Sequence, residues 1–399
     1  MAQSKPFLKN LFTIAVNESL SSVCMPKHLS NIDASNGLCI IGAGKASVDM
    51  AETIYQRFGE KCYGTIVTRH GYTEKSSIGR IQILSAGHPI PDEGSLHAGQ
   101  EILALAKRTP KDVPVLFLIS GGASAMMSLP IDEISFEEKM QLNQFLLASG
   151  ASINEINVVR KQLSKIKGGK LAQAIKGKYQ TLIISDVVGD DLSTIASGPT
   201  VKDNSTRTQA LAVLNKYHWH PIETVEQFLQ TNDENSIKLN SIPSETVAIM
   251  ANARNSIDKA ISCVDHDQWH TSVLDYDEVG DANVVAKQHA KIALQAKASG
   301  LPTLLFSGGE LTVTLCENSG QGGPNQQYML ALAAELNGIK GISALACDTD
   351  GIDGSEDVAG AFIDATTIAR ALEKNIKVEK HLRHNDCYNF FKQLDDLII

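Results

Sequence analysis

The sequence predicts an α/β fold built from two domains. Short apolar runs with β-branched residues are typical of buried strands, and here each run ends in a glycine-rich or acidic turn. Helical stretches separate the runs, which is the pattern of parallel sheets that carry ligand loops at the carboxyl ends of their strands. A chain of 399 residues is long enough for two such domains.

The elements of the first half follow from local patterns. Leu8 and Leu11 start a helical spacing near the N-terminus, and Ser135 with Glu138 forms a capping box. Strands are expected where apolar runs meet turn residues. The expected strands are 38–41, 63–68, 81–85, 113–119 and 181–184, and the expected helices are 48–58, 95–107, 135–147 and 153–175.

The second half begins with a polar, helical stretch from 202 to 245 that shows no strand pattern. The long helix 281–299 stops at Gly300, and Pro324 suits the first position of the helix 325–336. An apolar run leads into Ser307-Gly308-Gly309, as an earlier run leads into Ser120-Gly121-Gly122, which predicts two similar glycine loops. Further strands are expected at 246–250, 271–274 and 342–347.

Composition excludes several classes of protein. The net charge is −9, aromatic residues make up 5%, and no long basic run occurs, so a nucleic-acid-binding surface is not expected. No apolar run is long enough to span a membrane, and the N-terminus lacks an apolar signal core. The 7 cysteines are scattered without a CxxC pair, which favours a reducing, cytoplasmic setting.

Gly42-Ala-Gly44-Lys45-Ala-Ser47 joins a strand to a helix, the arrangement that cradles phosphates with backbone N–H groups and the helix dipole. It matches neither GxxxxGK[ST] nor GxGxxG. Lys45 is placed to contact a phosphate as a point charge; the alternative is a solvated lysine at a helix start.

Two further stretches favour anion binding. Consecutive N–H groups in Ser120–Ser124 can form a nest, because glycine lets the backbone approach a ligand closely. The stretch 153–175 is basic, and it includes Arg160 and the sequence Lys167-Gly-Gly-Lys170, whose glycines help two cations to converge. A solvated charged face is the alternative.

Acidic loops follow two of the strands. Asp186, Asp190 and Asp191 lie close together in a loop that ends in Ser197-Gly-Pro-Thr200, and such carboxylates become tolerable beside a hard cation. A polar surface loop is the alternative. The loop 348–354 alternates like an EF-hand but has Gly360 at the twelfth position, so only a metal-linked carboxylate remains open there.

Nests, lysines and carboxylates together suit phosphoryl transfer assisted by Mg²⁺. A dehydrogenase is the competing enzyme, although the strand 63–68 leads into Arg69-His70 where an acidic residue would bind ribose. A non-catalytic protein that binds a small metabolite is the third hypothesis, and it would not need the acidic loops.

The chain resembles the glycerate 2-kinases of the MOFRL type over nearly its whole length. The resemblance rests on GAGKAS (42–47), AGHPIPDEGS (86–95), LISGGASAM (118–126), INVVRKQLSKIKGGKLA (156–172), SDVVGDDLSTIASGPT (185–200), SGGE (307–310), GQGGPNQ (320–326) and DTDGIDGSEDVAGA (348–361). It implies phosphorylation of D-glycerate to 2-phosphoglycerate by ATP with Mg²⁺. The implied fold has a larger Rossmann-like domain, 1–240, and a smaller MOFRL domain, 241–399, with the active site in the cleft. Some relatives are labelled hydroxypyruvate reductase, so an NAD(P)H-dependent reductase is the alternative activity.

The resemblance also implies residue roles. Pro324 stands where some members have Arg, so a role proposed for that arginine cannot be transferred to this position. Members continue beyond the strand equivalent to 396–399, so we expect this C-terminal domain to lack ligand contacts or an edge. Whether the chain forms a homodimer is left open. Catalytic roles are implied for Lys45, Asp186 and Asp190. Metal binding is implied for Asp186, Asp190, Asp348 and Asp353, and substrate or phosphate binding for Gly42, Gly44, Ser47, Ser120, Gly121, Gly122, Ser124, Arg160, Lys167, Lys170, Ser197, Gly198, Thr200, Ser307, Gly308, Gly309, Glu310, Gly322, Gly323 and Asn325.

Overall fold

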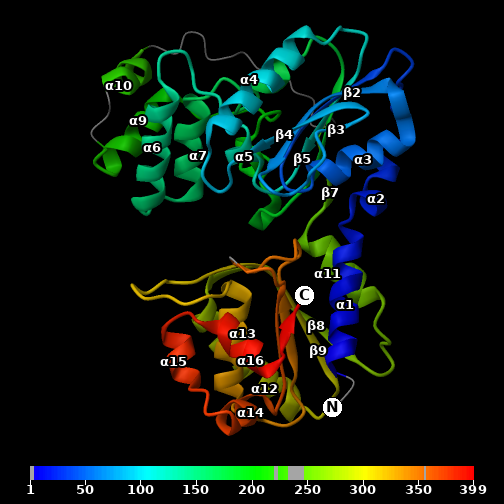
Figure 1. The fold of residues 1–399 in the computed structure, drawn as a ribbon, viewed down its shortest axis with the longest axis vertical. Helices are drawn as coiled ribbons and strands as arrows, with labels where there is room; N and C mark the ends of the chain where they lie inside the picture. The colour runs from blue at the N-terminus through cyan, green and yellow to red at the C-terminus, as the bar shows by residue number, and fades with distance from the viewer. Residues whose placement is uncertain (1–3, 220–222, 232–246, 355) are drawn as a thin grey trace. The chain divides into compact units, whose positions relative to one another are not determined.

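The structure is a computed structural model that describes residues 4–219, 223–231, 247–354 and 356–399 (Figure 1). It divides into two compact units. The first unit is Ser19–Asn252, and the second unit combines Met1–Glu18 with Ala253–Ile399. The predicted boundary at 240/241 falls within 232–246, outside the described residues. The strand that follows belongs to the first unit, and the N-terminal helix belongs to the second.

The first unit is organised on a seven-stranded sheet with the order β3-β4-β2-β1-β5-β6-β7. Every neighbouring pair is parallel except β3 with β4. The predicted α/β class and its parallel sheet are therefore confirmed. The strands are β1 (Leu38–Ala43), β2 (Cys62–Arg69), β3 (Ser77–Ile78), β4 (Arg80–Ala86), β5 (Val115–Ile119), β6 (Tyr179–Ile184) and β7 (Val247–Ala251).

Helices cover both faces of this sheet, because alternate side chains of each strand point to opposite sides. Cys39 and Ile41 belong to the core that α4 (Glu93–Arg108) and α5 (Ala123–Met126) complete. Leu38 and Ile40 belong to the opposite core, with α2 (Ser21–Cys24) and α3 (Ser47–Phe58). Burial on both faces explains why the strand sequences are continuous apolar runs and show no alternation.

A helical group stands beside the sheet in the first unit (Figure 1). It has its own apolar core, in which Leu142, Leu146, Ile156 and Leu214 are buried. The predicted capping box is confirmed at its first helix, where Ser135 Oγ accepts from Glu138 N and Ser135 N donates to Glu138. The helices are α6 (Phe136–Ala148), α7 (Ile153–Gln162), α9 (Arg207–Lys216) and α10 (Glu223–Gln230).

The single helix predicted over 153–175 is wrong. The α7 helix ends at Gln162, and the next helix, α8 (Lys170–Gln173), forms only after a turn. Gly168 and Gly169 have φ of 60° and 79°, which interrupts helical geometry and is readily adopted by glycine. Their N–H groups donate to the carbonyls of Ser197 and Gly198 at 3.0 and 2.7 Å. The glycine pair thus docks this segment onto the end of the acidic loop.

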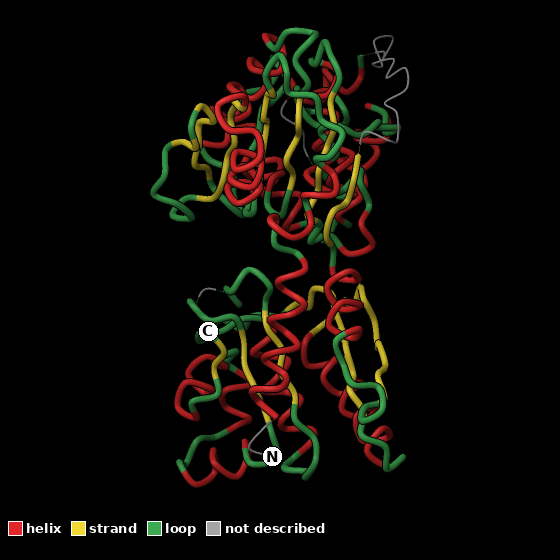
Figure 2. Tube along the Cα trace, turned by 90° about the vertical axis from the view of Figure 1, so that its right-hand side faces the viewer, coloured by secondary structure: helices red, strands yellow, loops and turns green. Residues whose placement is uncertain are grey.

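The second unit contains two small sheets (Figures 1 and 2). Parallel strands β8 (His270–Asp281) and β9 (Thr303–Thr312) form one, and the antiparallel strands β10 (Ala344–Cys347), β11 (Gly360–Ile363) and β12 (Leu397–Ile398) form the other. Most residues of helix α13 (Pro324–Leu336) are buried in the core of this unit, with Met329 and Leu330 at 0% exposure. The helices of this unit are α1 (Ser4–Glu18), α11 (Ala253–Ser262), α12 (Ala282–Ala298), α13 (Pro324–Leu336), α14 (Thr367–Glu373), α15 (Val378–Arg383) and α16 (Cys387–Leu394).

The predicted second glycine loop at 307–309 is wrong. Ser307, Gly308 and Gly309 lie inside β9, where they pair with β8 across an irregular register. A Cβ on Gly309 would lie 2.1 Å from the carbonyl oxygen of Glu278, and one on Gly308 would lie 2.8 Å from Ile257. The glycines therefore permit close packing within and against the strand pair, a requirement that the sequence pattern does not distinguish from a loop.

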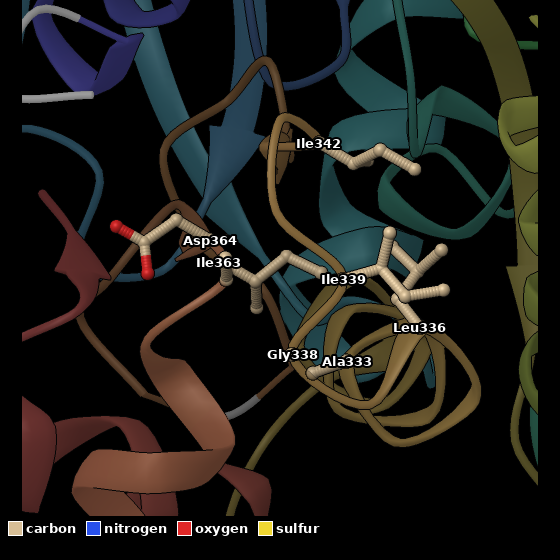
Figure 3. A pocket seen from close by; sticks show the side chains of 8 residues that line it. Ala333, Leu336, Gly338, Ile339, Ile342, Ile363 and Asp364 are labelled. Atoms are coloured by element: carbon tan, nitrogen blue, oxygen red, sulfur yellow. The ribbon is translucent and has the colours of Figure 1, made fainter. Parts of the chain in front are cut away.

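A small cavity lies at the end of α13 (Figure 3). Its volume is about 10 Å³, close to the minimum needed for one water molecule. Leu336, Ile339 and Ile363 contribute to its lining, and the Asp364 carboxylate points away from the leucine and isoleucine side chains. This cavity is too small for a substrate. Among the described residues, no helix has the length and apolar character to cross a membrane.

Gly44→Ala should strongly destabilise the first unit. Gly44 has φ of 125°, and an added Cβ would lie 2.3 Å from Ser120 Oγ and 2.6 Å from the Ser120 carbonyl oxygen. We expect a loss of more than about 2 kcal/mol in the free energy of unfolding, measured by urea titration. The control is Gly59→Ala, where φ is 58° but no atom lies within 4 Å, and a cost near 1 kcal/mol is expected. Equal losses in the two variants would contradict a steric role for Gly44.

Candidate functional site

The strand order of the first unit defines a switch point. From β1 the chain adds β2 and β4 on one side, and then returns to place β5, β6 and β7 on the other. The connections that follow β1 and β5 therefore diverge to opposite sides of the sheet. In open α/β sheets, ligands bind in the crevice that this divergence leaves at the carboxyl ends of the strands.

The loops after β1 and β5 are joined by hydrogen bonds at this point. Lys45 N donates to the Gly121 carbonyl at 2.9 Å, and Ser120 N donates to the Ala43 carbonyl at 3.1 Å. The Ser120 hydroxyl accepts from Ala46 N at 3.0 Å. The two predicted glycine loops of the first unit thus lie together, although Gly42 itself is the penultimate residue of β1 and packs against Ile66 and Leu118.

Ser47 links this loop to the neighbouring strand β2. The side chain is completely buried, and its hydroxyl donates to the Val67 carbonyl at 3.0 Å. That bond ties the start of α3 to β2 and uses the only proton of the hydroxyl. Ser47 therefore holds the loop in place.

Asp186 lies beside the same loops. It follows β6, is exposed, and packs so closely that a Cβ on Gly121 would lie 2.0 Å from its Oδ2 atom. Only glycine at position 121 allows this approach of carboxylate and backbone. Asp190 Oδ2 accepts from Asn252 Nδ2, which connects the acidic loop to the residue after β7.

Asp186 and Asp190 suit a cation that takes its remaining ligands from water and from a bound substrate. No cluster of three or more His, Cys, Asp or Glu side chains positioned to hold a metal occurs among the described residues. Mg²⁺ is commonly bound through one or two carboxylates together with water and substrate phosphates. The exposed Asp186 at the glycine loops fits that mode of binding.

Asp353, in the second unit, serves the start of α13. Its carboxylate accepts from Asn325 N at 3.0 Å and Gln326 N at 2.8 Å, and it is 1% exposed. Burial raises the pKa of Asp353 against the lowering effect of these hydrogen bonds. A carboxylate at a helix N-terminus is stabilised by the helix dipole, so this geometry favours a structural role for Asp353 over metal binding.

The other predicted site residues of the second unit lie in or next to α13, β9 and β10. Asn325 Nδ2 also donates to Asp353, and a Cβ on Gly323 would lie 2.4 Å from the Asp353 side chain. Gly322 precedes them with φ of 143°. Glu310 lies in β9, and Asp348 directly follows β10 and accepts from Asp350 N at 3.1 Å.

A shallow hollow of about 430 Å³ adjoins the ends of β2 and β4. It is lined by Arg69, His70 and the loop Gly87–Ile90, and its size falls in the range of small-molecule sites. The imidazole of His88 reaches the β5 loop, since a Cβ on Gly122 would lie 2.7 Å from it. Because the hollow is lined by basic residues and touches the switch point, it is a candidate for part of a bound anionic ligand.

Asp92 holds the lining loop of this hollow. Its carboxylate accepts from Gly87 N at 2.9 Å and contacts His70 Nε2 at 2.7 Å. Burial on its own raises the pKa of Asp92, but the hydrogen bonds from His70, Gly87 and Ser95 outweigh it and lower the pKa to about 2. The carboxylate is therefore ionised at neutral pH.

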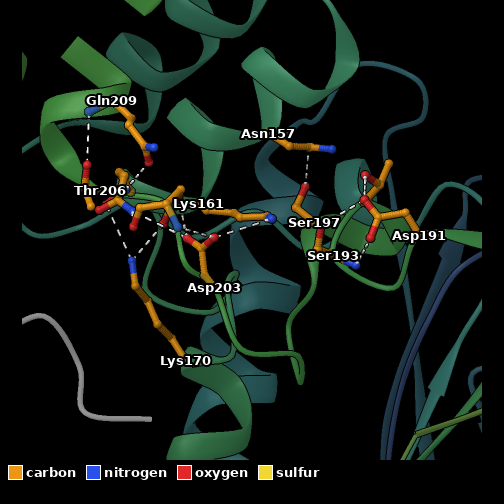
Figure 4. Close-up of polar contacts among 12 residues, drawn as sticks. Asn157, Lys161, Lys170, Asp191, Ser193, Ser197, Asp203, Thr206 and Gln209 are labelled. Atoms are coloured by element: carbon orange, nitrogen blue, oxygen red, sulfur yellow. Dashed lines mark hydrogen bonds and ion pairs between the residues drawn. The ribbon is translucent and has the colours of Figure 1, made fainter. Parts of the chain in front are cut away.

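Lys167 begins a buried hydrogen-bond chain. It is 1% exposed, and its Nζ donates to the Ser124 carbonyl at 2.7 Å and contacts the Ser124 hydroxyl at 2.6 Å. Ser124 Oγ lies 2.9 Å from Ser197 Oγ, which in turn donates to Asn157 Oδ1 at 3.0 Å (Figure 4). The predicted residues Lys167, Ser124 and Ser197 are thus brought together, and Asn157 joins them.

Lys170 is directed elsewhere. Its Nζ donates to the carbonyls of Lys161 and Ser164 at 2.7 and 2.6 Å, at the end of α7. A cation in that place complements the negative end of the helix dipole. Lys167 and Lys170 therefore bind different groups. The prediction that the glycine pair lets them converge on one anion is wrong.

The end of the acidic loop is strained. Ala196 and Ser197 have φ of 54° and 59°, and Gly198 follows with 61°. Left-handed backbone costs of order 1 kcal/mol for each non-glycine residue, so the surroundings must fix it. Thr200 helps to do so, because it is buried and accepts from Thr181 Oγ1 at 2.9 Å. In this conformation the Ser197 hydroxyl contacts Ser124 Oγ and Asn157 Oδ1.

The prediction from sequence missed Lys139. It lies on α6, is 3% exposed, and comes into electrostatic range of Arg160, Lys167 and Lys170. Burial lowers the pKa of Lys139 to about 7, and burial also lowers the pKa of Arg160. A lysine that directly follows two glutamates carries no sequence signal for burial, so only the packing of α6 against α7 reveals it.

The first unit is thus a doubly wound α/β domain with two glycine loops at its switch point. Residues 7–230 match a family model described as "Domain of unknown function (DUF4147)", and residues 303–399 match the MOFRL family. A glycerate 2-kinase of Pyrococcus horikoshii is 37% identical, covering 90% of this chain and 83% of that protein. A protein of Agrobacterium vitis that is provisionally named hydroxypyruvate reductase is 38% identical, covering 99% of this chain and 91% of that one.

A solved structure supports the same relationship. The crystal structure of glycerate kinase from Thermotoga maritima superposes with a TM-score of 0.88 at 33% identity, covering 100% of this chain and 96% of that one. The chain belongs to the family of MOFRL-type glycerate 2-kinases.

Lys139→Met should stabilise the ligand-free protein, and the effect should depend on pH. With its pKa lowered from 10.5 to about 7, Lys139 binds fewer protons in the folded than in the unfolded chain between these values. The stability of the parent protein therefore rises with pH across that window. We expect the variant to exceed the parent in free energy of unfolding at pH 6, with the gap shrinking by up to about 1.4 kcal/mol per pH unit above neutrality.

Urea titrations at several pH values measure this difference. Lys165→Met is the control, because Lys165 is partly exposed and paired with Asp132. That variant should show no comparable pH-dependent gap. A Lys139→Met variant that is less stable than the parent at every pH would contradict the assignment of an uncompensated ammonium group.

Proposed function

We propose that this protein is a glycerate 2-kinase that transfers the γ-phosphoryl group of ATP to the 2-hydroxyl of D-glycerate. The observation that carries the proposal is the meeting of the β1 and β5 loops with Asp186 at the switch point. Relatives of known activity and a glycerate kinase of the same fold support it. Phosphoryl transfer depends mainly on positioning and charge neutralisation, which such loops provide.

Each group of the proposed site has a separate role in phosphoryl transfer. The oxygen of the 2-hydroxyl attacks the γ-phosphorus, the bond from that phosphorus to the β-bridging oxygen breaks, and ADP leaves. Backbone N–H groups of the β5 loop and the Lys45 ammonium neutralise charge on the phosphoryl oxygens. Asp186 or Asp190 accepts the proton of the hydroxyl. Mg²⁺, when bound, supplies further neutralisation of the phosphates, and Asp186, which is exposed beside Gly121, is the carboxylate that would hold it.

The reductase alternative fits the loops less well. A dinucleotide fingerprint has glycine at the position of Ser47 and a carboxylate at the end of the next strand to bind the ribose. Here Ser47 is bonded to β2, and β2 ends at Arg69. A non-catalytic binding protein would not account for Asp186 at the phosphate loops.

Glycerate-dependent release of ADP from ATP and Mg²⁺ is the expected activity of the purified chain. A parallel reaction follows oxidation of NADH and NADPH with hydroxypyruvate, and no oxidation above background is expected. Reductase turnover without ADP release would overturn the kinase assignment and make the 42–47 turn a dinucleotide site.

Lys45→Met should lower kcat by at least 100-fold, because one charge that stabilises the transferring phosphoryl group is lost. Lys75→Met removes an exposed lysine of the same unit that pairs with Glu52, and its kcat should match the parent. Unaltered turnover by Lys45→Met would remove Lys45 from the proposed mechanism.

Asp186→Asn should weaken the dependence on Mg²⁺, because an amide cannot replace an anionic ligand. We expect the Mg²⁺ concentration for half-maximal activity to rise at least tenfold, measured by titration at saturating ATP. An unchanged Mg²⁺ titration with reduced kcat would instead make Asp186 the proton acceptor.

A further inference from the structure

Lys139 is a buried cation without a partner. It is 3% exposed, and its Nζ makes no hydrogen bond with any of the described residues. Buried polar groups are almost always paired, and an unpaired ammonium is among the most costly exceptions. The lysine belongs to neither of the loops that the proposed mechanism uses, so its presence needs a separate explanation.

The surroundings of Lys139 are cationic. Lys139 and Asn143 are four residues apart on α6 and so share a face, which Arg160 of α7 contacts by donating from Nε to Asn143 Oδ1 at 3.2 Å. The charges of Arg160 and Lys170 act on Lys139, and those of Lys139 and Arg160 act on Lys167. Within the described ranges, neither Lys139 nor Arg160 nor Lys167 forms an ion pair with a carboxylate.

Neutral donors border the same cluster. Asn157 is 3% exposed, and its Nδ2 has no partner in the described part of the chain, while its Oδ1 accepts from Ser197. Figure 4 shows the oxygen of this amide turned to Ser197 and the nitrogen turned away from it. Ser124 and Ser197 then link Asn157 to Lys167. Two buried donor groups are thus left unsatisfied around one group of cations.

We propose that Lys139, Arg160, Lys167 and Asn157 form an internal site for an oxyanion, and that Lys139 is one of its direct ligands. An oxyanion accepts several hydrogen bonds at once and supplies the negative charge that this cluster lacks. The inference rests on the proposed function and extends it by assigning the place of a substrate charge. The chemistry is that of a carboxylate or a phosphate, carried by D-glycerate or by ATP.

Of these two candidate oxyanions, the arrangement of the residues favours the carboxylate of D-glycerate. In the proposed mechanism, the backbone N–H groups after β5 and the Lys45 ammonium already hold the phosphates. Ser124 lies just beyond that cradle, at the start of α5, and connects it to Lys167. A small hydroxy acid could therefore reach the cations with its carboxylate while its hydroxyl faces the phosphoryl group.

The test compares Lys139→Met and Lys139→Gln with the parent in steady-state kinetics. Both substitutions remove the charge, and glutamine keeps a neutral donor. We expect the KM for D-glycerate to rise at least tenfold in the Met variant and less in the Gln variant, while kcat changes by less than threefold. A rise confined to the KM for ATP also supports the oxyanion site and assigns the anion as a phosphate.

Binding is measured separately from turnover. Inorganic phosphate and D-glycerate, each without nucleotide, should raise the thermal unfolding temperature of the parent, and should raise it less or not at all in Lys139→Met. Lys165→Met is the matched control, since Lys165 lies two residues before Lys167 but is paired with Asp132. Its kinetics and anion-dependent stabilisation should equal those of the parent.

The outcomes separate this inference from the proposed function. If the parent and Lys165→Met release ADP with D-glycerate, but Lys139→Met keeps both KM values and the full anion-dependent stabilisation, the oxyanion site is overturned and the kinase stands. If the parent releases no ADP, the kinase assignment fails. In that case, loss of phosphate-dependent stabilisation in Lys139→Met and Lys139→Gln still supports the oxyanion site, and its retention overturns it.

Discussion

The close approach of the loops after β1 and β5 is the constraint on which the first unit depends. Gly44 can touch Ser120 only without a side chain, and the hydrogen bonds between the two loops require that contact. The same approach brings Gly121 to Asp186. The geometry of the switch point therefore follows from two positions at which a Cβ cannot be accommodated, Gly44 and Gly121, and from a sheet order that places β1 beside β5.

Charge is distributed unevenly around this centre. On the side of the helical group, Lys139 and Lys167 are buried without a carboxylate partner among the described residues, whereas the loop after β6 exposes carboxylates. Lys170 and Asp92 show how the chain compensates charges that serve structure, by helix carbonyls in the first case and by N–H donors in the second. Among the described residues, the Lys139 ammonium and the Asn157 amide nitrogen lack such hydrogen bonds, which is uncommon for buried polar groups.

Much of the fold was predictable because burial on both faces of a parallel sheet produces continuous apolar runs. All strands expected in the first unit occur, with boundaries within a few residues. The errors have a common origin in glycine. Gly168 and Gly169 interrupt the helix expected at 153–175, and Gly308 and Gly309 lie in a strand where a loop was expected. A glycine indicates that a Cβ is excluded, but the sequence does not say whether a turn or a neighbouring strand excludes it.

The candidate site was less predictable because its members play unequal parts. Lys45 and Asp186 stand at strand ends, where position alone is informative, but Ser47 and Asp353 prove to be bonded into the structure. The sequence motifs predict which residues lie near the switch point. They do not predict which of their polar atoms are already used in hydrogen bonds within the protein. Lys139 shows the opposite case, since its importance comes only from the face of α6 on which it lies.

The second unit is discontinuous along the chain, and this has a consequence for biosynthesis. Helix α1 packs on α11, with Phe7 stacked on Trp269 at 5.5 Å and Leu11 in one core with Val264 and Leu304. The ribosome completes all of Ser19–Asn252 before these partners exist. The first unit can therefore fold during translation as an autonomous domain, while the apolar face of α1 stays uncovered and within reach of chaperones until its partners emerge.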